Sequence, residues 1–89
     1  MTTEQINDFK PGIYRHYKGR YYQALFLAQL ADGGATLVIF VPLYSEPRLE
    51  GLRVRARTLS EWNERVEGVE FNFVRRFEYV GQELPPETP

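Results

Sequence analysis

The sequence contains no cysteine and a single histidine, and each shortage removes a class of chemistry. Without cysteine the chain forms no disulfide, binds no zinc through thiolates and has no cysteine nucleophile. Because His16 is the only histidine, a metal site built from several histidines is excluded. No apolar run approaches the roughly 18 residues of a membrane span, and the acidic start lacks the basic and apolar regions of a signal peptide. We therefore expect a cytoplasmic protein without cofactor, metal or membrane contact.

The 89 residues have the composition of a small globular domain. Hydrophobic residues make up 43% of the chain and aromatic residues 15%, which is too apolar for a disordered protein. A chain of this length supports one modest core. We predict a single domain over residues 1–80 and a disordered tail over 81–89, because the last segment carries three prolines and Leu84 as its only large aliphatic residue.

Alternating and β-branched segments predict a mainly β fold. The expected strands are 13–17, 21–30, 36–44, 52–57 and 75–80, and the segment 69–74 is ambiguous. Turn signals separate the first strands: Pro11-Gly12, Lys18-Gly19-Arg20 and Asp32-Gly33-Gly34. Five short strands and one helix before the last strand are typical of a small SH3-like, partly open barrel of antiparallel strands. The alternative is a twisted antiparallel sheet backed by the helix.

The helix is expected just after the fourth strand. Thr58 and Glu61 have the spacing of a capping box, with Thr58 as the N-cap. Three apolar residues then recur at helical spacing: Leu59, Trp62 and Val66. This pattern predicts about two helical turns that end at Gly68 and place Trp62 in the core, beside strand residues such as Ile39.

Basic residues gather in two segments although the net charge is only −1. Residues 10–30 include four basic side chains and no acidic one, and the strand 52–57 alternates apolar residues with arginines. The apolar set is expected to be buried, and Arg53, Arg55 and Arg57 to face outward. Arginine forks match phosphate and carboxylate geometry, and nearby tyrosines can stack on bases. The alternative is a solvated strand face whose arginines pair with the glutamates of residues 61–70.

One octapeptide carries a family resemblance. Residues 12–19 read Gly-Ile-Tyr-Arg-His-Tyr-Lys-Gly, which resembles the opening G-x-Y-R-H-[YF]-K-G of a small bacterial family, the domain of unknown function 1653. Looser matches follow at residues 22–25, 38–44 and 76–79, so that the resemblance covers residues 12–80. It implies a small SH3-like, mainly β domain and no established activity. The sequence departs from the family at Arg53, where the family has tryptophan, and at Ala56, where it has proline.

The residues indicate a binding module more than an enzyme. His16 has no partner carboxylate or nucleophile that the sequence identifies, and a hydrogen-bonded structural role is the alternative for it. We expect a non-enzymatic module whose basic, tyrosine-rich face binds an anionic or nucleotide-like ligand, with nucleic acid as the leading choice. The candidate ligand-binding residues are Tyr14, Arg15, His16, Tyr44, Arg53, Arg55 and Arg57. The alternative is a protein-interaction or assembly domain that uses exposed strand edges near Phe40 and Tyr44.

Overall fold

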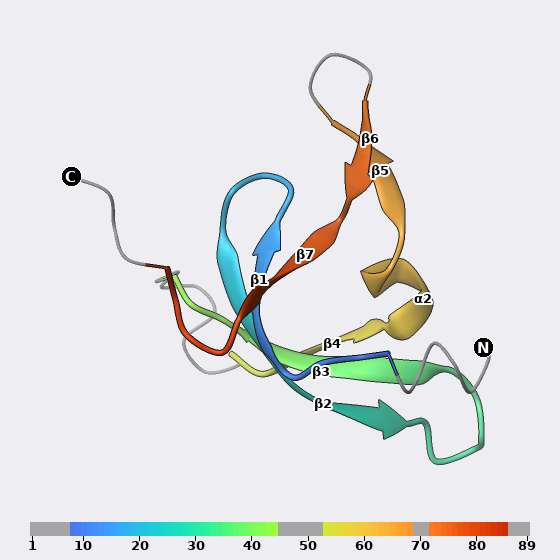
Figure 1. Cartoon of the computed structure of the whole chain (residues 1–89). Helices are drawn as coiled ribbons and strands as arrows, with labels where there is room; N and C mark the ends of the chain where they lie inside the picture. Colours follow the sequence, from blue (N-terminus) through green and yellow to red (C-terminus); the bar gives the residue numbers. More distant parts are fainter. Residues whose placement is uncertain (1–7, 45–52, 69–71, 86–89) are drawn as a thin grey trace.

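The computed structural model describes residues 8–44, 53–68 and 72–85. Five antiparallel strands form one sheet in the order β4-β3-β2-β1-β7 (Figure 1). Their bounds are β1 Gly12–His16, β2 Tyr21–Gln29, β3 Thr36–Pro42, β4 Arg55–Thr58 and β7 Phe77–Gly81. The one-turn helix α2 (Leu59–Trp62) follows β4, and a second sheet pairs β5 (Arg65–Glu67) with β6 (Phe73–Arg75).

This architecture confirms the predicted mainly β fold with five antiparallel strands and one short helix. The strands β4 and β7 are the two edges of the sheet, and no ladder of the described residues joins them. The sheet is therefore open and does not close into a complete barrel.

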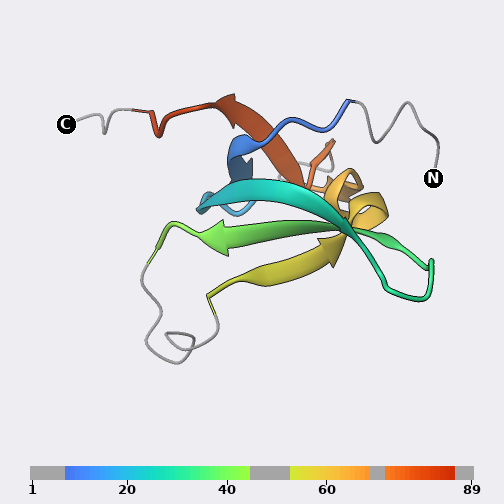
Figure 2. The same ribbon diagram turned by 90° about the horizontal axis from the view of Figure 1, so that it is seen from below.

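The strand β2 bends the sheet so that one face becomes concave. Its first residues pair with β1, and its length from Tyr22 to Gln29 pairs with β3. The register of the second pairing shifts between Ala24 and Phe26, which makes Leu25 the extra residue of a β-bulge. A bulge bends its strand and increases the local twist. As a result β1 and β7 run at a steep angle to β3, β4 and the second half of β2 in Figure 1, and the curve of β2 over β3 is visible in Figure 2.

The core lies on the concave face and is mainly aromatic. Alternate residues of a strand share a face, and directly opposed residues of neighbouring strands share it too. The register sets Tyr14 opposite both Tyr22 and Tyr79, and Ala24 opposite Phe40. Trp62 from α2 covers these side chains and is only 1% exposed. The sequence-based placement of Trp62 in the core is thus confirmed. Its expected neighbour Ile39 is wrong, because Ile39 lies opposite Phe26 and Ala56 on the other face of the sheet, and Trp62 packs on Phe40 and Phe77 instead.

The helix is shorter than its apolar spacing predicts. Thr58 is the N-cap, and its hydroxyl accepts a hydrogen bond from the Glu61 backbone N–H at 3.2 Å. The helix nevertheless ends after one turn, with Asn63 as the C-cap. Val66 lies in β5 opposite Val74 of β6, because the chain gains a strand ladder there in place of a second turn. The prediction of a two-turn helix that includes Val66 is therefore wrong.

The two sides of β4 are inverted relative to the prediction. Arg55 and Arg57 lie opposite Phe40 and Val38, both buried, and so share the core side of the sheet. Val54 is 62% exposed, although the alternation predicts it to be buried. Because β4 is an edge strand, the apolar stems of the arginines can cover aromatic rings while the guanidinium groups stay hydrated. Leu52, the third residue of the predicted apolar set, lies outside the described residues.

The predicted last strand, 75–80, is divided in the structure. Arg75 ends β6, Arg76 forms a break, and β7 runs from Phe77 to Gly81. Within β7, Phe77 is buried and Tyr79 is half-buried against the core, as the alternation indicates. Gln82 follows and donates hydrogen bonds to the Pro11 carbonyl at 2.9 Å and the Tyr79 hydroxyl at 2.8 Å. Disorder of the tail stays a prediction, and its last residues, 86–89, lie outside the described part of the chain.

Candidate functional site: a basic aromatic face

The hairpin between β1 and β2 positions the first side chains of the site. The His16 backbone N–H donates to the Arg20 carbonyl at 2.8 Å, and the Gly19 N–H donates to the His16 carbonyl at 2.7 Å. Gly19 adopts a φ of 103°, a conformation that a glycine reaches without steric cost. The Lys18 backbone N–H donates to Nδ1 of His16 at 3.2 Å. This bond leaves Nδ1 as an acceptor and assigns the imidazole proton to Nε2.

Two tyrosines extend the site across β2 and the end of β3. The hydroxyls of Tyr22 and Tyr44 lie 3.0 Å apart and form a hydrogen bond. Their rings meet edge to face with centroids 5.5 Å apart, and the His16 ring lies 6.1 Å from the Tyr22 ring. The imidazole also contacts Phe77, at 5.0 Å between centroids. His16 and the two tyrosines therefore form one continuous cluster that is joined to the aromatic core.

Arginines from two different segments border this cluster. The Arg20 guanidinium lies 4.3 Å from the centroid of the Tyr44 ring, a cation–π contact. The Arg57 guanidinium lies 5.9 Å from the centroid of the Phe77 ring. Arg55 is close enough to Tyr22 for its charge to lower the pKa of the Tyr22 hydroxyl. We call this set the basic aromatic face: His16, Arg20, Tyr22, Tyr44, Arg55 and Arg57.

The electrostatic surroundings of His16 are positive. Its pKa is lowered, first by burial and then by the charges of Arg76, Lys18 and Arg57. All three neighbouring charges have the same sign, so they disfavour protonation of the imidazole. The neutral ring offers its Nε2–H as a donor, and an anion beside it would be stabilised by the same positive charges.

Tyr22 is held in its neutral form. Burial, the main cause, and the hydrogen bond to Tyr44 together raise its pKa to about 12. The charges of Arg55 and Arg20 act in the opposite direction. A hydroxyl with this pKa stays protonated at physiological pH, so the Tyr22–Tyr44 pair is a neutral hydrogen-bonding element between cationic side chains.

The structure brings together His16, Tyr44, Arg55 and Arg57 from the set that the sequence indicates. Arg57 also forms a salt bridge with Glu61, with Nη1 and Oε2 3.1 Å apart. The pairing of strand arginines with glutamates, raised from the sequence as an alternative, thus occurs at this residue. While it is paired with Glu61, the Arg57 guanidinium stays 5.9 Å from the centroid of the Phe77 ring.

The other three indicated residues have different positions. Tyr14 is buried, and its hydroxyl donates to the Lys10 carbonyl at 2.7 Å. Arg15 is exposed opposite Glu78 and alternates with Tyr14 and His16, which places it on the other side of β1. Arg53 Nη2 donates to the carbonyls of Pro42 at 2.8 Å and Tyr44 at 3.2 Å, so it anchors the end of β3.

Arg20 and Tyr22 belong to the face but are absent from the indicated set. Both had sequence signals, because Arg20 lies in an acid-free basic segment and Tyr22 in a run of tyrosines. Their proximity to Tyr44, however, depends on the register that sets Tyr22 opposite Pro42. A single sequence does not specify this register.

The described residues offer no metal centre of ordinary composition. No group of three or more histidine, aspartate or glutamate side chains comes together among them. Within the same residues, no helix is both long and apolar enough to cross a membrane.

Comparison with known proteins places the chain in a family. Residues 12–79 match the family model described as a protein of unknown function, DUF1653. The chain belongs to the DUF1653 family. It is similar to a crystal structure of a DUF1653 protein from Bordetella bronchiseptica, with 40% sequence identity and a TM-score of 0.80 over 91% of this chain and 99% of that one. No curated protein matches the chain.

Proposed function

We propose that this DUF1653 domain is a non-enzymatic binding module whose basic aromatic face takes an anionic, planar ligand of the nucleotide type. The observation that carries the proposal is the convergence of positive charge on His16 and Tyr22. Five basic side chains act on these two rings: Lys18, Arg20, Arg55, Arg57 and Arg76. Two of them, Arg57 and Arg76, also form salt bridges with Glu61 and Glu64. They come from the β1–β2 turn, from β4 and from the break before β7, which lie far apart in the sequence.

The chemistry of the face suits a phosphate beside a planar group. Guanidinium groups bind phosphate oxygens through paired hydrogen bonds, and the neutral His16 adds a ring N–H donor. Tyr44 is half-buried, and Arg20 lies against its ring. Aromatic rings and arginine planes beside a basic groove are the elements with which proteins hold single-stranded nucleic acid. Single-stranded nucleic acid is therefore the leading ligand.

The surroundings of His16 support a binding role over a catalytic one. A general base of the histidine type is usually oriented by a carboxylate or another acceptor at its second nitrogen. Here Nδ1 accepts a backbone N–H from Lys18, and the neighbouring charges that shift the pKa are cationic. This arrangement favours a neutral donor to a ligand over a residue that removes a proton.

Fluorescence anisotropy with single-stranded and duplex oligonucleotides at two salt concentrations tests the proposal. Counterion release makes the affinity fall with salt, with a slope of about 0.7 per neutralised phosphate for single strands. Arg20→Gln and Arg55→Gln each remove one contacting arginine and should weaken binding to oligonucleotides of every sequence. Each should also reduce the slope of log affinity against log salt concentration by the amount that belongs to one phosphate contact.

Arg15→Gln is the matched control. It removes the same charge from β1, but Arg15 lies on the other side of that strand. We expect Arg15→Gln to retain most of the affinity that Arg20→Gln and Arg55→Gln lose. Equal losses of affinity in all three variants would show that binding depends only on the net charge of the protein. Absence of binding at low salt would refute the nucleic-acid proposal.

A protein-interaction role is the second candidate, but on a different surface from the one first expected. Phe40 is buried and Tyr44 is half-buried, so the edge near them offers little apolar area. Phe26 is instead 54% exposed and forms a row with Ile39 and the exposed Ala56 on the outer face of the sheet. Light scattering over a range of protein concentrations tests self-association, which Phe26→Ser should weaken. A constant monomer mass would exclude it.

A further inference from the structure

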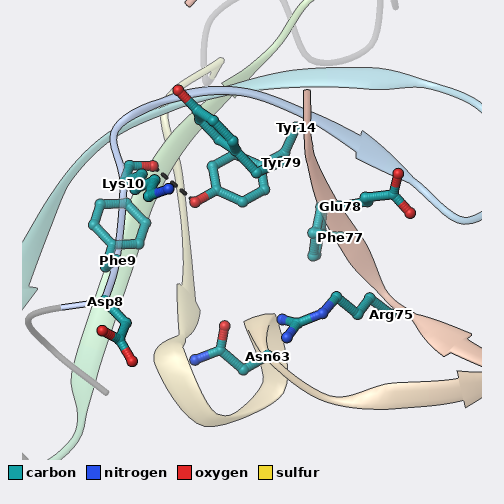
Figure 3. A pocket seen from close by; sticks show the side chains of 9 residues that line it. All are labelled: Asp8, Phe9, Lys10, Tyr14, Asn63, Arg75, Phe77, Glu78 and Tyr79. Carbon is teal, nitrogen blue, oxygen red and sulfur yellow. Dashed lines mark hydrogen bonds between the residues drawn. The ribbon is translucent and has the colours of Figure 1, made fainter. Parts of the chain in front are cut away.

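A pocket of about 520 Å³ lies away from the basic aromatic face, between the segment before β1, the end of α2 and the β6–β7 region (Figure 3). Its volume is within the range of about 300 to 1,000 Å³ that is usual for small-molecule sites. Its floor is formed by two buried rings, Tyr14 and Phe77. The half-buried rings of Phe9 and Tyr79 form its walls.

The aromatic lining is held in a fixed arrangement. The Tyr14 hydroxyl donates to the Lys10 carbonyl, and this bond fastens the segment before β1 to the floor. Phe9 consequently lies parallel to Tyr14, with centroids 6.3 Å apart and an angle of 7° between the rings. Tyr79 meets Tyr14 edge to face at 5.4 Å, and Gln82 donates to its hydroxyl. Three rings from two segments thus present a preformed apolar surface.

Arg75 and Asn63 provide the polar side of the pocket. Figure 3 shows the Arg75 guanidinium directed toward the Asn63 amide, across the pocket from Tyr79. In the part of the chain that the structure describes, neither side chain has a salt bridge or a hydrogen bond. A guanidinium fork beside an amide NH₂ offers several N–H donors, which is the geometry that a carboxylate accepts in bidentate form.

The charge balance of the pocket limits the ligand to one negative charge. Lys10 and Arg75 contribute two cations and Asp8 one carboxylate, whereas Figure 3 shows the Glu78 carboxylate directed away from the other lining side chains. The Lys10 ammonium lies 5.4 Å from the Tyr79 ring, at the far side from Arg75. A polyphosphate or an oligonucleotide would place further negative charge beside Asp8, which like-charge repulsion disfavours.

We propose that this pocket is a second binding site, which takes a small aromatic monocarboxylate. The carboxylate accepts hydrogen bonds from Arg75 and Asn63, and the ring of the ligand packs on Tyr14, Phe9 and Tyr79. The site is independent of the basic aromatic face, because its ligand is a singly charged small molecule and its residues are different.

Indole-3-acetate and its uncharged analogue indole-3-acetamide are the probes that test this site by amide NMR titration. We expect the acetate to shift the signals of Phe9, Arg75 and Tyr79, and the acetamide to bind about tenfold more weakly or worse, because it lacks the charge that Arg75 pairs with. Arg75→Gln should reduce acetate affinity by a similar factor. The matched control is Arg15→Gln, which removes the same charge at an exposed residue outside the lining of the pocket, on the side of β1 away from Tyr14, and should leave affinity unchanged.

Three results would overturn the proposal. The first is equal affinity for the acetate and the acetamide, which would make the pocket a merely apolar site. The second is equal affinity of the wild type and Arg75→Gln, and the third is the absence of shifts up to the solubility limit of the acetate. Failure of oligonucleotide binding has no bearing on these outcomes, so the two sites are tested separately.

Discussion

The ring of Trp62 stacks on the ring of Phe77 with centroids 3.8 Å apart and an angle of 6° between the planes. This contact joins α2 to β7, two elements that no backbone ladder connects. Phe77 also lies edge to face with His16 at 5.0 Å, so the same stack supports the imidazole of the basic aromatic face. The stability of the core and the geometry of the site therefore depend on one aromatic pair.

Truncation of this pair should be severely destabilising. Trp62→Ala removes a side chain that is 1% exposed, and we expect it to lower the free energy of unfolding by about 3 to 5 kcal/mol. In a domain of this size such a loss lowers the melting temperature by more than about 10 °C. Trp62→Phe retains an aromatic ring and should lose less, and Val54→Ala, at a 62% exposed position, should lose little. Thermal unfolding followed by circular dichroism would contradict this if Trp62→Ala melted within a few degrees of the wild type.

The strands that carry the core could be predicted closely from the sequence. β2 and β3 begin at the predicted residues, Tyr21 and Thr36. Runs of β-branched and aromatic residues favour strands, and the glycine-containing turns on either side fix where these strands begin. The N-cap at Thr58 follows from side-chain chemistry within four residues. The end of α2 could not be predicted in this way, because it depends on the ladder that β5 forms with β6.

The site was less predictable because it depends on which side of β4 faces the core. Alternation defines two faces of a strand but does not say which one is buried. Arg55 and Arg57 lie on the core side of the sheet, and this orientation brings Arg57 to His16 and Arg55 to Tyr22. A prediction from hydrophobicity alone assigns the core to Val54 and Ala56, both of which are exposed.

Gly12 should tolerate no side chain. Its φ of 144° is a conformation that other residues rarely adopt, and a Cβ atom there would lie 2.8 Å from the Gly81 carbonyl oxygen. We expect Gly12→Ala to lower the free energy of unfolding by more than the roughly 1 to 3 kcal/mol of backbone strain alone. Gly19→Ala is the control, because Gly19 also has positive φ but no atom within 4 Å of the added Cβ. Equal losses in urea unfolding would show that the contact with Gly81 is relieved by a small shift.

We expect the end of the chain to contribute to stability up to Gln82 and little beyond it. Gln82 donates to the Pro11 carbonyl and the Tyr79 hydroxyl, while Leu84 is exposed. A chain that ends after Gln82 should therefore unfold at the same urea concentration as the full chain. Gln82→Ala should cost about 1 kcal/mol, at the usual value of such hydrogen bonds. A clear loss of stability on truncation after Gln82 would show that a later residue packs on the domain.

Protonation of His16 should make the stability of the protein depend on pH. The pKa of His16 is lowered from 6.5 by burial and by Arg76, Lys18 and Arg57, so the unfolded chain binds this proton more readily than the folded one. The stability that depends on a neutral His16 is therefore complete above about pH 6.5 and is lost as the pH falls through the lowered pKa. Protonation at Nδ1 would also remove the acceptor of the Lys18 N–H.

The comparison of the wild type with His16→Gln isolates this contribution from that of the carboxylates, which titrate in both proteins. We expect the difference between their free energies of unfolding to be constant above about pH 7 and to move against the wild type below about pH 6.5. An anion bound on the basic aromatic face would offset the positive charges and raise the pKa of His16, because it stabilises the imidazolium. The NMR titration of the His16 ring with and without an oligonucleotide measures this shift directly. An unchanged pKa in the bound state would place the ligand away from His16, even if the affinity were high.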